Sequence, residues 1–78
     1  MNLCHFLGLE TDQQAKYIPY AIYQATRLEG NYCILLYLFN DFYVEVFFDV
    51  DEWTISHIHG FRSRSSLIPY INLGNSIK

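Results

Sequence analysis

The chain has few of the residues that would tie a small protein together or direct it to nucleic acid. It has only two cysteines in 78 residues, and Cys33 lies within an apolar run, so a secreted disulfide framework is excluded. The five lysines and arginines form no basic stripe, and the formal net charge is −3. We therefore expect no nucleic-acid partner, because binding to nucleic acid depends on neutralising phosphates.

The chain also lacks a long apolar run. Near its start only residues 3–9 are apolar, this stretch contains His5, and no basic residue precedes it. A membrane span needs about 20 apolar residues, and a signal peptide starts with a basic region. The sequence therefore predicts a cytoplasmic protein with no membrane partner.

The chain is rich in apolar and aromatic residues. It is 51% hydrophobic and 18% aromatic, which is far from the composition of a disordered protein. A single core in so short a chain supplies only about 3–5 kcal/mol of stability. We expect one α+β domain over residues 11–78, preceded by a leader over residues 1–10 whose order the sequence leaves open.

Three strand-like runs follow one another in the middle of the chain and predict an antiparallel meander. Short breaks at Asn40-Asp41 and at residues 50–52 separate them. In the third run, Ile55 and Ile58 can share a face only if a bulge lies between them, and Gly60 is expected to end the strand. The runs span residues 32–39, 42–49 and 53–59.

The segment before the meander has two interpretations. Residues 20–28 are rich in residues that favour strands and end in the turn signal Glu29-Gly30-Asn31, which predicts a first strand. Ala21, Ala25 and Leu28 lie at helical spacing, which leaves a kinked helix open. We favour the strand, and hence a four-stranded antiparallel meander.

Short helices are expected at both ends of the meander. Thr11 and Gln14 form a capping box that begins a helix, and Pro19 ends that helix. Near the C-terminus, Ser65 or Ser66 can cap a second short helix.

The number of loop residues in the central hairpin decides which side chains share a face. A two-residue loop at Asn40-Asp41 gives a mixed face of Cys33, Leu35, Tyr37, Val44, Val46 and Phe48. A three-residue loop, with Asp41 in the left-handed conformation, gives a core face of Ile34, Leu36, Leu38, Val44, Val46 and Phe48. We favour the three-residue loop, whose reverse face holds Cys33, Leu35, Tyr37, Tyr43, Glu45 and Phe47.

Two short helices are too small to cover both faces of this sheet. Four strands spaced ~4.8 Å apart present about 500 Å² per face, whereas two helices of about seven residues cover on the order of 200 Å². We expect less than half of one face to be covered and the other face to remain bare. The chain should therefore form a homodimer, or bind another protein, through an aromatic interface made of Tyr37, Tyr43, Glu45 and Phe47.

Few side chains indicate chemistry. His57 and His59 point to the same side of a strand and could bind a small ligand or a metal, with Arg62 or Arg64 contributing positive charge. No residues have the spacing of a structural metal site, so we expect no metal and no cofactor. No nucleophile, base and orienting group occur together, so we expect an accessory or interaction module and not an enzyme.

The order of several motifs resembles a group of short bacterial proteins of unknown function. The motifs are Thr26-Arg27, residues 31–37, residues 40–48, Ile55, Ile58 and residues 67–71. The resemblance covers residues 20–73 and implies four strands instead of a kinked helix. It implies no activity, substrate or cofactor.

Overall fold

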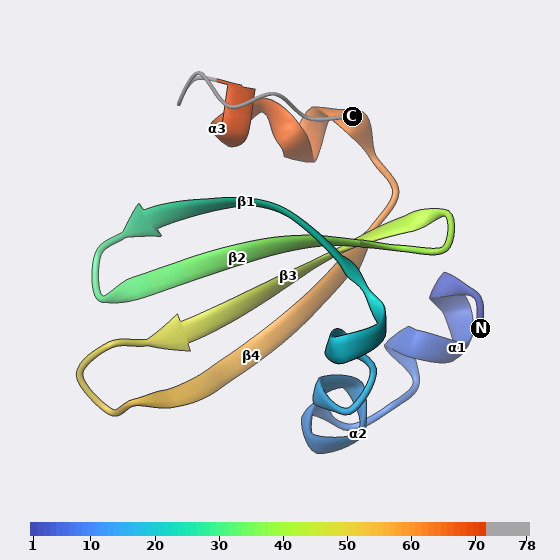
Figure 1. Cartoon of the computed structure of the whole chain (residues 1–78), viewed down its shortest axis with the longest axis horizontal. Helices are drawn as coiled ribbons and strands as arrows, with labels where there is room; N and C mark the ends of the chain where they lie inside the picture. Colours follow the sequence, from blue (N-terminus) through green and yellow to red (C-terminus); the bar gives the residue numbers. More distant parts are fainter. Residues whose placement is uncertain (72–78) are drawn as a thin grey trace.

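The computed structural model describes residues 1–71 and forms one four-stranded sheet with short helices at both ends (Figure 1). The predicted α+β meander is confirmed, and the segment before it is a strand. The end of the predicted domain, residues 72–78, lies outside the described residues. The strands are antiparallel in the order β1 (Ile22–Glu29), β2 (Tyr32–Phe39), β3 (Phe42–Asp49) and β4 (Thr54–Phe61).

The N-terminal segment folds into α1 (Leu3–Leu7), α2 (Thr11–Ala15) and the 3-10 helix η1 (Ile18–Tyr20). The leader is thus helical in part. The predicted Thr11 capping box is wrong, because Glu10 is the cap and its N–H donates to the Gln13 side chain at 3.2 Å. None of the helices in residues 1–71 combines the length and the apolar character needed to cross a membrane.

After β4 the chain forms the 3-10 helix η2 (Arg64–Leu67) and then α3 (Ile68–Ile71). The prediction that Ser65 or Ser66 caps a helix is wrong. Both serines lie inside η2, and the Ser65 hydroxyl instead lies 2.7 Å from the Ser63 hydroxyl. Together, η2 and α3 form only about two helical turns. So short a helical segment has little stability of its own, and its position therefore depends on packing against the sheet.

A two-residue turn, Asn40-Asp41, joins β2 to β3 and pairs Phe39 with Phe42. The prediction of a three-residue loop is therefore wrong. Asn40, not Asp41, adopts the left-handed conformation, with a φ of 55°. Asparagine tolerates this region better than most residues, so the turn closes without a third residue.

This register sorts the strand side chains into two faces, which we call face A and face B. Face A has the cross-strand rows Leu28-Cys33-Phe48-Ile55, Thr26-Leu35-Val46-Ile58 and Tyr23-Tyr37-Val44-Gly60. Face B has the rows Arg27-Ile34-Phe47-His57, Ala25-Leu36-Glu45-His59 and Ile22-Leu38-Tyr43-Phe61. The register of β4 shifts at Ser56, which is the bulge predicted to bring Ile55 and Ile58 to one face.

The helices at the two ends of the chain cover parts of opposite faces. On face A, the fully buried Phe6 of α1 packs in a cluster with Phe42, Val44 and Val46. On face B, the C-terminal segment contributes Leu67 and Tyr70 to a cluster with Ala25, Leu36 and Phe61. The expectation of one bare face is wrong, because the leader supplies a helix that the sequence did not predict.

Gly60 lies inside β4 and does not end it. A Cβ at this position would lie 3.0 Å from Leu3 Cδ1 and 3.3 Å from Phe6 Cδ2. The absence of a side chain therefore lets α1 lie directly against the strand.

Candidate functional site

A buried polar cluster lies on face B beneath α3. Its centre is Glu45, which is only 5% exposed. The Tyr70 hydroxyl donates to Glu45 at 2.7 Å, and Arg27 Nη2 donates to the same carboxylate at 3.3 Å. His59 Nδ1 lies 3.2 Å from the other carboxylate oxygen. Glu45 thus has partners from β1, β4 and α3, as a buried carboxylate requires.

Electrostatics in this cluster favour neutral Tyr70 and charged Arg27. Burial and the hydrogen bond to Glu45 raise the pKa of Tyr70, because both disfavour the phenolate. Burial lowers the pKa of Arg27, but hydrogen bonds to Glu29, Tyr70 and Glu45 outweigh it and the pKa is raised overall. The guanidinium carbon also lies 5.3 Å from the centre of the Tyr70 ring. The arrangement is that of a network that joins α3 to the sheet.

The four residues predicted to form one interface do not share a face. Tyr37 lies on face A, where its ring is 6.0 Å from that of Tyr23. Tyr43, Glu45 and Phe47 lie on face B. Glu45 is buried and does not point outward. The cause is the hairpin turn, because a loop shorter by one residue moves one strand's side chains to the opposite face.

His57 and His59 lie on the same face, as predicted. The His57 ring stacks on Phe47 at 4.1 Å, and the His59 ring stacks on Phe61 at 5.4 Å. Within residues 1–71, no group of three or more His, Cys, Asp or Glu side chains is placed to hold a metal. Each imidazole instead stacks on an aromatic ring, and that of His59 also contacts the Glu45 carboxylate.

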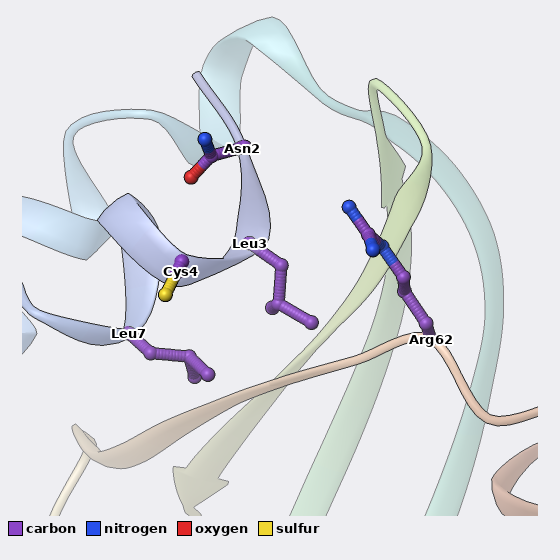
Figure 2. A pocket seen from close by; sticks show the side chains of 5 residues that line it. All are labelled: Asn2, Leu3, Cys4, Leu7 and Arg62. Atoms are coloured by element: carbon purple, nitrogen blue, oxygen red, sulfur yellow. The ribbon is translucent and has the colours of Figure 1, made fainter.

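Arg62 lines a pocket of about 350 Å³ between α1 and the end of β4 (Figure 2). Its Nη2 donates to the Asp41 carboxylate at 3.2 Å. Arg64 is exposed in η2 and does not line the pocket. The structure thus separates the two arginines that the sequence grouped together. The other residues that line the pocket are Asn2, Leu3, Cys4 and Leu7.

One end of the sheet lies away from α1 and α2 (Figure 1). At this end the strand pairing places a row of apolar residues across face A. Leu28 is 77% exposed and Ile55 is 38% exposed. Trp53, also 77% exposed, places its ring 5.6 Å from that of Phe48. We call the set the apolar row, and its members are Leu28, Cys33, Phe48, Trp53 and Ile55.

Comparison with protein families, curated proteins and solved structures finds no match for this chain. Its side chains are what indicate a function. Sequence reasoning missed the apolar row, although Leu28 and Trp53 border the two turns at the same end of the sheet. The alternative with a two-residue turn at Asn40-Asp41 could have revealed the row, because this turn places Cys33 opposite Phe48.

Proposed function

We propose that the protein is an interaction module that associates with a second copy of itself through the apolar row. The observation that supports this is the exposure of Leu28 and Trp53, which are both 77% accessible. Single exposed apolar residues are ordinary on a protein surface, whereas a contiguous set marks an interaction surface. A row that crosses the whole sheet can face its own copy about a twofold axis, so that the same residues meet.

The size of the row favours a reversible dimer. At about 25 cal/mol per Å², burying Trp53 contributes roughly 4 kcal/mol and burying Leu28 roughly 2 kcal/mol. Burying both residues on each of the two copies contributes on the order of 12 kcal/mol. Association itself costs roughly 4–15 kcal/mol. The resulting dissociation constant is about micromolar or weaker.

The folded monomer is already compact, which also favours a reversible association. Its accessible surface is 5113 Å², close to the about 4,900 Å² expected for a monomer of this mass. The dimer would therefore form between chains that are already folded. Self-association would then be governed by concentration, and folding would not depend on it.

Acidic side chains border the apolar row. Asp51 and Glu52 belong to the turn before Trp53. In a symmetric pair, these carboxylates approach those of the second copy and repel them. Salt screens such exposed charges over about 10 Å at 0.1 M. Self-association should therefore strengthen as salt is added, whereas binding of a basic partner would weaken.

Charge substitutions in the row test the proposal. Leu28→Glu and Trp53→Glu should each give a monomer at concentrations where the wild-type chain self-associates, as measured by sedimentation velocity. Ile68→Glu is the matched control, because Ile68 is an exposed residue of α3, 52% accessible, outside the row. Identical sedimentation of all four proteins would contradict the proposal, and circular dichroism would show that each variant is folded.

A further inference from the structure

The pocket beside Arg62 combines an apolar side with a positive charge. Leu3 and Leu7 project from α1 toward the strand that leads into Arg62, whose guanidinium lies across the pocket (Figure 2). The volume of about 350 Å³ is within the range of small-molecule sites, roughly 300–1,000 Å³. The pocket is thus large enough for a small organic ligand.

The guanidinium of Arg62 retains capacity for a second anion. Its side chain is 56% exposed, and that of its partner Asp41 is 69% exposed. Ion pairs this exposed are weak and readily exchanged. A guanidinium also has five N–H donors, and the bond to Asp41 at 3.2 Å involves Nη2 alone. A carboxylate entering the pocket could bind the remaining donors in the paired geometry that arginine favours.

The apolar side of the pocket narrows the class of ligand. Leu7 is 53% exposed, and Leu3 packs against the cluster around Phe6. A purely polar anion would leave these leucines in water, whereas an alkyl group would cover them. We infer that this pocket binds a small organic acid with an apolar tail, held by its carboxylate at Arg62 and by its tail at Leu3 and Leu7.

Three probes separate the contributions of charge and tail. Hexanoate carries both, hexanol carries the tail alone, and acetate carries the charge alone. In a titration followed by amide chemical shifts, hexanoate should bind roughly five- to tenfold more tightly than either of the others. The reason is that hexanoate makes both the charged hydrogen bond to Arg62 and the apolar contact of the tail, whereas each of the others makes one of them. If hexanol or acetate bound as tightly as hexanoate, the inference would be overturned.

Substitutions near the pocket make the test specific. Arg62→Gln should weaken hexanoate binding roughly five- to tenfold, whereas Arg64→Gln, which removes an exposed arginine outside the pocket, should leave it unchanged. Asp41→Asn should strengthen binding, because it removes the carboxylate that competes for Arg62. Equal weakening by Arg64→Gln would show that general charge attraction and not Arg62 holds the ligand. Weaker binding in Asp41→Asn would contradict the competition between Asp41 and the ligand for Arg62 and overturn the inference.

Cys4 provides a local readout of occupancy. It is exposed and lines the pocket, whereas the other free cysteine, Cys33, belongs to the apolar row. Saturating hexanoate should slow the alkylation of Cys4 by iodoacetamide and leave that of Cys33 unchanged, as quantified by mass spectrometry of peptides. Unchanged labelling of Cys4 would place the ligand elsewhere and overturn the inference. The test is independent of self-association, because the apolar row lies at the opposite end of the sheet.

Discussion

The hydroxyl of Tyr70 on α3 donates a hydrogen bond of 2.7 Å to the carboxylate of Glu45 on β3, and both residues are buried. Glu45 also meets Arg27 of β1 and His59 of β4. A helix of four residues has little stability of its own, because isolated helices shorter than about 12 residues are marginal in water. The position of α3 therefore depends on the burial of Tyr70 and on this bond.

Removing the Tyr70 hydroxyl should destabilise the fold. Tyr70→Phe keeps the buried ring but deprives Glu45 of a donor, which costs about 1–3 kcal/mol of the free energy of unfolding. Urea denaturation measures the change. Tyr20→Phe is the control, because Tyr20 is 77% exposed, and it should change stability by less than about 0.5 kcal/mol. Equal stability of the two variants would show that the hydrogen bond does not stabilise the fold.

Stability should fall in alkaline solution because the pKa of Tyr70 is raised above its ordinary value of 10.0. Above pH 10 the unfolded chain loses this proton while the folded chain keeps it, so the free energy of unfolding decreases as the pH rises. The contribution of Tyr70 is complete below pH 10. In urea denaturation between pH 8 and pH 11, the wild-type chain should lose stability more steeply than Tyr70→Phe. Parallel pH profiles would contradict the assignment.

The effects of substituting Arg27 and Glu45 on the free energy of unfolding should not be additive. Arg27 is 15% exposed and Glu45 is 6% exposed at the side chain, so Glu45→Leu leaves the buried guanidinium with the exposed Glu29 as its carboxylate partner and costs about 3–5 kcal/mol. Arg27→Met combined with Glu45→Leu removes both charges and should recover about 1–3 kcal/mol of that loss. Thermal denaturation of the two single variants and the double variant gives the coupling. A double variant as unstable as the sum of the singles would contradict a direct interaction.

Adding a side chain at Gly60 should disturb the contact between α1 and β4. Even a Cβ would lie 3.0 Å from Leu3 Cδ1, so Gly60→Val overpacks the contact and costs about 1–3 kcal/mol. Gly8→Ala provides the comparison, because its added Cβ would meet the His5 carbonyl at an ordinary 3.5 Å. It should change stability by less than about 0.5 kcal/mol. Equal denaturation midpoints in urea would show that α1 does not rest on Gly60.

Much of the sheet follows from local features of the sequence. The strands were predictable because β-favouring runs alternate with short turn signals such as Asn40-Asp41. The bulge in β4 was predictable from the spacing of Ile55 and Ile58, since both are apolar and only an extra residue brings them to one face. These features depend on neighbours in the chain and on few distant contacts.

The hairpin register and the site could not be predicted in the same way. The register depended on whether Asn40 or Asp41 adopts a positive φ, and both residues can do so. The partners of Glu45 come from three distant segments, so its burial is visible only once Tyr70 lies over face B. The covering of face A by Phe6 was missed because a five-residue helix has no clear periodicity.

The central claim is self-association through Leu28 and Trp53, and light scattering over a dilution series tests it most directly. The average mass should rise from that of the 9.2 kDa monomer toward twice that value as the concentration passes through the micromolar range and above, and added salt should move the rise to lower concentration. The Leu28→Glu variant should remain monomeric throughout. A wild-type mass that stays at the monomer value up to millimolar concentration would contradict the account.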